Sequence, residues 1–242
     1  MDFTKIKAIV NESSNVVFFD GAGTSTESGI PDFRSASGLF ASLHDDRYSP
    51  EELLSHDFFM NHTEQFYDFY KKKMIYKDAR PNQAHLALAK LEKRGNLQAI
   101  ITQNIDGLHR QAGSQRVLEL HGSVQRNYCM TCGTSFSLEY ILQSEQAVPT
   151  CDQCGGVVKP DVVLYQEALP EDVLEEALTR VSEADVLIVA GTSLKVYPAA
   201  ALLQFYNNQK LILINNSTTP YDMYADFVIN DSIGKVMQQL VQ

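Results

Sequence analysis

The sequence contains no apolar segment long enough to cross a membrane. Its longest uninterrupted apolar runs, such as residues 186–190, have only five residues, whereas a membrane-spanning helix needs roughly 20 apolar residues. Residues 1–14 also lack the sustained apolar stretch of a secretory signal peptide. We therefore expect a cytoplasmic protein that makes no membrane contact.

Cysteine is also scarce, and it occurs in pairs. The chain has only four cysteines, Cys129, Cys132, Cys151 and Cys154. Structural disulfides are rare in a reducing compartment, and redox use of one Cys-x2-Cys pair would leave the other pair unexplained. The pattern therefore favours a metal site over a disulfide framework.

Positive charge is in deficit. Lys and Arg number 20 against 30 Asp and Glu, which gives a formal charge of −10 at pH 7 and an isoelectric point near 5.0. An acidic surface disfavours nonspecific binding to nucleic acid or anionic membranes. We therefore expect no direct nucleic-acid partner. An acidic surface instead suits basic, lysine-bearing partners.

The remaining composition is that of an ordinary globular chain, with 44% hydrophobic and 21% charged residues over 242 positions. Apolar runs alternate with helical stretches, which is typical of an α/β fold with a doubly wound parallel sheet. Residues 39–76 are different, because they carry aromatic, His and Lys residues without a strand pattern and are expected to form small helices. The expected strands are 16–20, 97–102, 117–120, 162–165, 186–190, 211–215 and 227–229.

The cysteine spacing is that of a zinc ribbon. Two Cys-x2-Cys pairs are separated by 18 residues, and Gly133 and Gly155 allow a tight turn after each pair. Four thiolates complete a tetrahedral zinc site and leave no position open for water, so the expected zinc ion is structural and not catalytic. Some zinc ribbons bind nucleic acid, but this segment offers little positive charge beyond Arg126.

The rest of the chain is organised around residues 16–35. A buried-strand pattern, VVFFD, runs directly into Gly21-Ala22-Gly23. Such a turn lets backbone N–H groups approach a ligand closely, and a helix that follows it points its positive end at a phosphate. The pattern departs from an ordinary dehydrogenase, because Thr26 stands where a third glycine is usual and no acid ends a second strand.

The continuation, SGIPDFRS at 28–35, places an acid, an aromatic ring and a guanidinium beside that turn. The stretch GAGTSTESGIPDFRS resembles the first signature of the sirtuins, the NAD-dependent protein deacylases. Further matches follow in the sirtuin order: TQNID with Leu108-His109, then LHG at 120–122, the cysteine quartet, GTS at 191–193, and Asn215. The resemblance therefore covers nearly the whole chain.

The resemblance implies a bacterial-type, single-domain member with a two-part architecture. A Rossmann-like NAD-binding domain would comprise residues 1–38, 77–125 and 158–242. A helical insert (39–76) and a zinc-ribbon insert (126–157) would together form a small domain. Cofactor and acyl-lysine would meet between the two parts.

The resemblance also implies the roles of individual residues. His121 is expected to act as general base on the ribose hydroxyls, a task that suits an imidazole, and Asn104 is expected to be catalytic as well. Val163, Leu164 and Tyr165 would bind the substrate, whereas His109 is expected to be structural. The implied NAD contacts are Gly21, Ala22, Gly23, Thr26, Asp32, Phe33, Arg34, Gln103, Asn104, Ile105, Asp106, Gly191, Thr192, Ser193, Asn215 and Ile233.

The implied reaction consumes NAD. The acyl-lysine oxygen attacks the nicotinamide ribose, and the products are nicotinamide, free lysine and O-acyl-ADP-ribose. Acylated lysine proteins or peptides would be the partners. Arg34 is expected either to contact a phosphate or to stabilise the loop, unless it forms only a salt bridge with Asp32.

Two departures from the family pattern concern the substrate. Gln166 stands where the family usually has Gly, which adds bulk at the rim of the peptide channel. Tyr70 occupies the position at which desuccinylating members carry Arg, so we expect acetyl and neutral acyl chains to be preferred over succinyl.

Three alternatives remain at this point. The first is an NAD-dependent protein mono-ADP-ribosyltransferase. The second is a noncatalytic zinc-ribbon binding module, and the third, disfavoured by the missing ribose acid, is an ordinary dehydrogenase.

Overall fold

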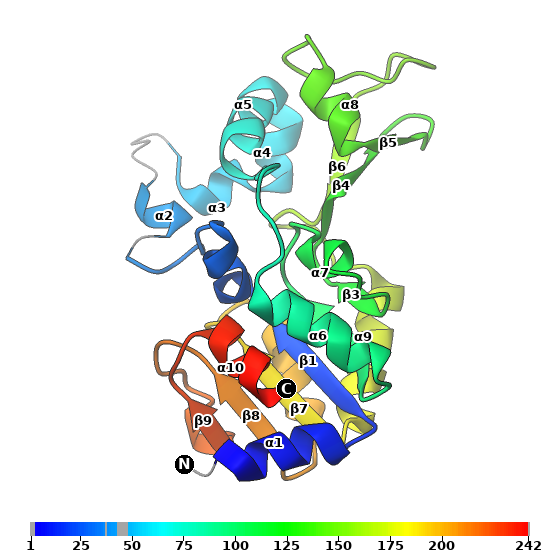
Figure 1. Cartoon of the computed structure of the whole chain (residues 1–242). Coiled ribbons are helices and arrows are strands. Elements are labelled where there is room, and N and C mark those ends of the chain that lie inside the picture. Colours follow the sequence, from blue (N-terminus) through cyan, green and yellow to red (C-terminus); the bar gives the residue numbers. More distant parts are fainter. Residues whose placement is uncertain (1–2, 37, 43–47, 242) are drawn as a thin grey trace.

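The computed structural model describes residues 3–36, 38–42 and 48–241, and it is dominated by one parallel sheet (Figure 1). The strand order is β3-β2-β1-β7-β8-β9, and every neighbouring pair is parallel. The doubly wound α/β sheet expected from the sequence is therefore confirmed. Its strands are β1 (Val16–Asp20), β2 (Leu97–Thr102), β3 (Val117–Glu119), β7 (Val186–Ala190), β8 (Leu211–Ile214) and β9 (Phe227–Ile229).

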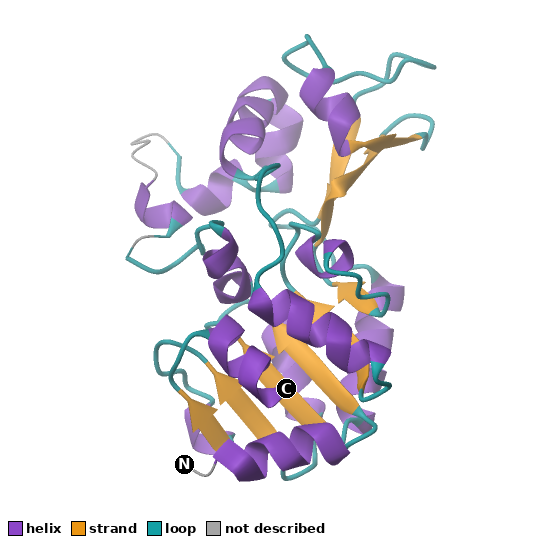
Figure 2. Cartoon of the chain, in the orientation of Figure 1, coloured by secondary structure: helices purple, strands orange, loops and turns teal. Residues whose placement is uncertain are grey.

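Both faces of this sheet are covered by helices, as Figure 2 shows. Side chains of a strand alternate between faces: Val16 and Phe18 of β1 pack in one apolar cluster, and Val17 and Phe19 pack in another. All four side chains are fully buried, and each contributes about 1.5–3 kcal/mol through burial. The first cluster contains α1 (Phe3–Glu12), α6 (Gln83–Lys93) and α10 (Ile233–Leu240), and the second contains α9 (Glu171–Glu183) and the 3-10 helix η2 (Ala199–Phe205).

A second, antiparallel sheet has the order β5-β4-β6. It consists of β4 (Gly122–Cys129), β5 (Ser135–Ser137) and β6 (Val158–Val162), and α8 (Leu138–Gln143) follows β5. The strand expected over 162–165 in the parallel sheet is wrong, because the strand ends at Val162 and pairs with β4. Its apolar residues gave a buried-strand pattern, but they pack in the core of the smaller unit.

The helical insert shares one core with this small sheet. Its helices are α2 (Leu39–Ser42), α3 (Pro50–Leu53), α4 (His56–Asn61) and α5 (Thr63–Lys73). Ser49 and Glu52 form a capping box on α3, in which the Ser49 side chain accepts the Glu52 N–H and the Glu52 carboxylate accepts the Ser49 N–H. Such short helices are marginal alone, and buried aromatic side chains such as Phe59 and Tyr67 pack them against Val158 of β6.

The remaining described helices are short and belong to loops. They are the 3-10 helices η1 (Ala22–Ser28) and η3 (Asp222–Tyr224) and the single-turn helix α7 (Leu108–Gln111). Among the described residues, no helix combines the length and apolarity that a membrane span requires.

Candidate active site

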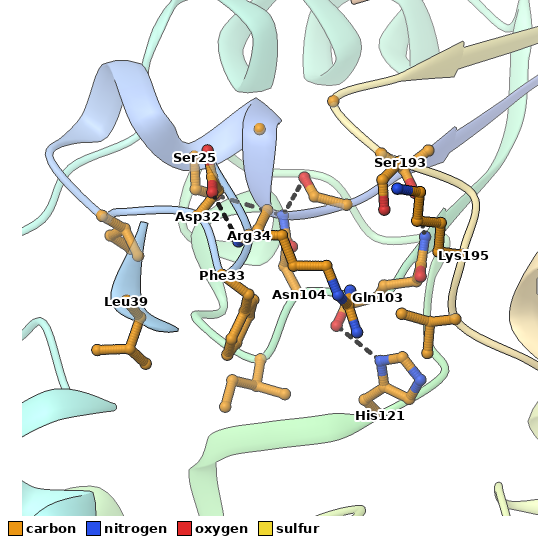
Figure 3. Close-up of a pocket in the computed structure, with 18 of the residues that line it drawn as sticks. Ser25, Asp32, Phe33, Arg34, Leu39, Gln103, Asn104, His121, Ser193 and Lys195 are labelled. Atoms are coloured by element: carbon orange, nitrogen blue, oxygen red, sulfur yellow. Dashed lines mark hydrogen bonds between the residues drawn. The ribbon is translucent and has the colours of Figure 1, made fainter. Parts of the chain in front are cut away.

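A cavity of about 820 Å³ lies at the carboxyl ends of β1, β2, β7 and β8. This is the edge at which open α/β sheets bind ligands. Leu54, Met74 and Tyr76 from the helical insert region close it on the other side. The cavity is lined by each NAD and substrate residue expected from the sequence and by His121, and Figure 3 shows the arrangement of several of them.

The Gly21-Ala22-Gly23 turn provides a close approach between two loops. The Gly23 N–H donates to the Gly191 carbonyl oxygen at 2.8 Å, and a Cβ on Gly23 would lie 2.7 Å from Gly191 Cα. The Gly23 N–H is therefore used within the protein. The expectation that this group would be presented to a ligand is wrong. The segment that follows is the 3-10 helix η1 and not an α-helix.

The loop 103–106 joins β2 to α7 and presents polar groups to the cavity. The Asn104 side-chain amide donates to the Gly21 carbonyl oxygen at 3.1 Å. The Ser25 hydroxyl donates to Asp106 Oδ2 at 2.7 Å, and the Leu108 N–H donates to Asp106 Oδ1 at 2.8 Å. Burial raises the pKa of Asp106, and these hydrogen bonds oppose that effect. The loop thus holds an amide and a carboxyl group in fixed positions.

His121 follows β3 and faces the same cavity (Figure 3). Its Nδ1 lies 2.9 Å from the Gln103 carbonyl oxygen. Because a carbonyl only accepts, Nδ1 carries the proton in this contact and Nε2 is left as a proton acceptor. Burial lowers the pKa of His121, against the opposing effect of the Gln103 contact. The ring is therefore neutral near pH 7 and suited to act as a base.

The segment after η1 forms another wall of the cavity. Asp32 Oδ1 accepts the N–H groups of Arg34 and Ser35 at 3.0 and 2.7 Å. The carboxyl group thus stabilises the loop, and no Asp32–Arg34 side-chain ion pair occurs among the interactions described for this segment. The Arg34 guanidinium lies 5.8 Å from the Phe40 ring centre, and the side chain points into the pocket in Figure 3.

The loops after β7 and β8 lie opposite this wall. Asn215 Oδ1 accepts the Thr192 N–H at 3.2 Å, and Gln103 Nε2 donates to Thr192 Oγ1 at 3.1 Å. Asn215 Nδ2 is buried and has no described protein partner. A buried donor without a partner is costly, so this lining fits a bound polar group such as a ribose or an adenine ring.

The four cysteines converge at the far end of the small sheet. Their sulfur atoms all lie within 4.8 Å of one another, and two of the sulfur pairs are 3.4 and 3.7 Å apart. Tetrahedral zinc with Zn–S bonds of about 2.3 Å places its sulfurs about 3.8 Å apart. The cluster thus fits one zinc ion, and Gly133 and Gly155 adopt positive φ values of 72° and 74° in the turns expected of them.

Comparison with known proteins decides the family. The Sir2 family pattern matches residues 21–198. The chain belongs to the Sir2 family. It is 60% identical to an NAD-dependent protein deacetylase of Clostridium acetobutylicum, over 98% of this chain and 97% of that one. It is also 60% identical to a protein of the same name from Clostridium tetani, over 100% and 98% of the two chains.

Solved sirtuin structures have the same fold. A Sir2 complex with a p53 peptide and NAD+ superposes with a TM-score of 0.86 at 39% identity, over 99% of this chain and 97% of that one. A Sir2 variant with a deacetylated p53 peptide and 3′-O-acetyl-ADP-ribose gives a TM-score of 0.89 at 38% identity, with the same coverage.

Residues 163–165, which the resemblance led us to expect at the substrate, are held by backbone hydrogen bonds to His121 and to the helical insert. The Val163 N–H donates to the His121 carbonyl oxygen at 3.0 Å. Tyr165 exchanges backbone hydrogen bonds of 2.9 Å with Leu54 and His56. Gln166, at the position of the family's Gly, has a φ of 76°, and its side chain is bound to Asp57 through two hydrogen bonds. The left-handed backbone explains why glycine suits this position.

Several cavity residues escaped the sequence analysis. Ser25 was missed because serine in a glycine-rich turn has no specific signal, although it binds Asp106. The polar run 216–219 directly follows Asn215 and lines the cavity. Its place after an expected strand was a signal that could have identified it, because all carboxyl ends of a parallel sheet share one edge.

Proposed function

We propose that this sirtuin is an NAD-dependent protein-lysine deacetylase. The reaction converts acyl-lysine, NAD and water to lysine, nicotinamide and O-acyl-ADP-ribose. The observation that carries the proposal is that the 103–106 loop, His121 and the backbone edge 163–165 line a single cavity. The full-length likeness to named deacetylases supports it.

The proposed roles follow from the positions of the side chains. NAD supplies the ribose carbon that the acyl oxygen attacks when nicotinamide leaves. Asn104 and Asp106 bind the nicotinamide carboxamide, while Ile105 and Phe33 line the apolar side and exclude water from the reacting carbon. His121 takes a proton from a ribose hydroxyl through Nε2.

The remaining cavity residues bind the rest of the cofactor and the peptide. Thr192, Ser193 and Asn215 contact the adenosine half, and Ile233 packs beside it. Gln103 contacts the ribose near the reacting carbon, and Arg34 contacts a phosphate from its loop. Val163, Leu164 and Tyr165 pair with the peptide, a mode that tolerates varied sequences. The other expected contacts in the glycine turn and at Asp32 shape the phosphate-facing wall.

We also propose the domain division 1–38, 77–125 and 158–242 for the NAD-binding domain, with 39–76 and 126–157 as the small domain. In this division β6 and the first residues of β4 belong to the NAD-binding segments and extend from them into the small sheet. The four thiols are close enough to share one zinc ion, and a reducing compartment keeps thiols available for metal. We therefore propose the cytoplasm as the location.

The deciding experiment follows the fate of both substrates, the acetyl-lysine peptide and NAD. An acetyl-lysine peptide is incubated with adenine-labelled NAD, and the products are analysed by mass spectrometry. We expect loss of the acetyl group together with nicotinamide and labelled O-acetyl-ADP-ribose in equal amounts. Label on protein with the acetyl group retained would instead identify an ADP-ribosyltransferase.

The pH profile of kcat/KM tests whether the His121 imidazole is neutral in the free enzyme. Because burial lowers its pKa from the ordinary value, the neutral base persists to below about pH 6.5. We expect activity to be flat from pH 8 down to about 6.5 and to fall only at lower pH. The folded protein also binds a proton at His121 less readily than the unfolded chain does. The free energy of unfolding therefore decreases as pH falls through the same range. An acid limb centred above about pH 7 would contradict the assignment.

The preference among acyl substrates tests the expectation that Tyr70, in place of Arg, disfavours succinyl-lysine. This ring is 1% exposed within the aromatic core of the small unit, so the position offers no guanidinium to a carboxylate. We expect kcat/KM for an acetyl peptide to exceed that for the matched succinyl peptide by at least about 100-fold, since the succinylate would lose a charge-assisted pair. Comparable rates would refute this expectation. In that case Lys73, a cation that lines the cavity, would be tested next. A lower kcat/KM of Lys73→Met for the succinyl peptide alone would show that this lysine pairs with the succinyl carboxylate.

A further inference from the structure

Beneath the cavity lies a buried group of ionisable side chains that has no role in the chemistry described above. Asp20 at the end of β1 is fully buried, His109 of α7 is 2% exposed, and His85 of α6 is fully buried. His109 Nε2 lies 3.0 Å from Asp20 Oδ2. The His85 and His109 ring centres are 4.6 Å apart.

The surroundings of the two histidines shift their pKa values in opposite directions. His85 Nδ1 accepts the Asn82 N–H, and burial, with a contribution from His109, lowers the pKa of His85 to about 3. Burial alone would lower the pKa of His109, but the charge and hydrogen bond of Asp20 outweigh it and the pKa is raised. Asp106 and Glu119 act in the same direction. The contact with Asp20 therefore favours the protonated form of His109.

Asp20 holds the 103–106 loop at both of its ends. At the entry, the Asp20 carbonyl oxygen accepts the Gln103 backbone N–H and Gln103 Nε2, both at 3.1 Å. At the exit, the Asp20 carboxylate binds His109, which follows the loop in α7. Between these points, Asn104 binds Gly21, the residue after Asp20.

We propose that Asp20 and His109 are positioning residues that fix Asn104 and Asp106 for binding of the nicotinamide carboxamide. The inference rests on the proposed function, and neither residue lines the cavity. A buried ion pair is a poor source of net stability compared with apolar packing, but it fixes the direction of a contact. Here that contact sets where α7 begins and therefore where Asp106, which accepts the first N–H of α7, is held.

The test separates positioning from stability. Asp20→Ala and His109→Phe each break the pair, whereas Asp20→Asn/His109→Phe replaces both ionisable groups with neutral ones of similar volume. Asn96→Ala is the control, because it removes two hydrogen bonds at the opposite end of β2. For each protein we measure the melting temperature, the nicotinamide concentration that half-inhibits deacetylation, and the ADP-ribose dissociation constant.

The three variants of Asp20 and His109 are called the cluster variants. In all three we expect the half-inhibiting nicotinamide concentration to rise at least about tenfold, while the ADP-ribose dissociation constant stays within about threefold of the native value. The double variant should regain the melting temperature lost by His109→Phe without regaining nicotinamide sensitivity. If sensitivity returns together with the melting temperature, or if both ligands weaken equally, the pair is only structural and the proposal is wrong.

A second readout does not depend on activity. In the free protein, the amides of residues 104–108 should exchange hydrogen at least about tenfold faster in the cluster variants than in Asn96→Ala. Unchanged exchange would overturn the proposal even if the native protein deacetylates its substrate. Conversely, absence of deacetylation by the native protein would refute the proposed function, while the exchange rates would still decide whether the pair holds the loop.

Discussion

His121→Ala is expected to lower kcat/KM for deacetylation by about 10³-fold, within the range of 10²–10⁴ that a positioned general base supplies. The imidazole is oriented by its 2.9 Å contact with the Gln103 carbonyl, which leaves Nε2 as the acceptor inside the cavity. Alanine removes the acceptor and leaves the cavity walls in place. The loss should therefore appear in kcat, and the NAD dissociation constant should change by less than about threefold.

The effect is measured by product formation under single-turnover conditions, with NAD binding followed separately by calorimetry. His62→Gln is a matched control, because His62 contacts Tyr48 and Phe58 in the helical insert and does not line the cavity. We expect this control to retain activity within about twofold. Residual activity of His121→Ala above about a tenth of the native value would exclude His121 as the base.

Removal of zinc is expected to unfold the small sheet and abolish deacetylation. Zinc binding contributes about 10–16 kcal/mol of folding free energy in small zinc-finger peptides. In this sirtuin, β4 and β6 run directly from the cysteine cluster to the active site. β4 begins at Gly122, next to His121, and β6 ends at Val162, next to residues 163–165, for which we propose a role in peptide binding. Loss of the ion should therefore disorder both the proposed base and the backbone proposed to bind the peptide.

The variant for this test is Cys151→Ala, with Gln153→Ala as the control in the same loop, because Gln153 contributes no sulfur ligand. Metal content, thermal unfolding and deacetylation are measured together. We expect Cys151→Ala to lose zinc and more than about 99% of activity, with the parallel sheet still folded by circular dichroism. Full activity in a zinc-free protein would show that the cluster does not support the site.

The sequence predicted those features whose causes are local in the chain. Strand patterns identified β1, β2, β7, β8 and β9, because alternating or continuous burial follows from the period of a strand. The spacing of the four cysteines predicted their convergence, since two Cys-x2-Cys turns have few ways to surround one ion. Motif resemblance identified many, but not all, of the residues that line the cavity. They meet there because a parallel sheet brings the carboxyl ends of its strands to one edge.

Only the tertiary structure decided which segments pair across long separations. The apolar pattern at 162–165 could not show that β6 would join β4 in the small sheet, since an apolar run fits any buried strand. The contact between Ser25 and Asp106 and the pair formed by Asp20 and His109 join residues far apart in sequence. Their existence depends on how the strands pack, and burial then gives each pairing its energetic weight, because an unpaired polar group is costly once water is excluded.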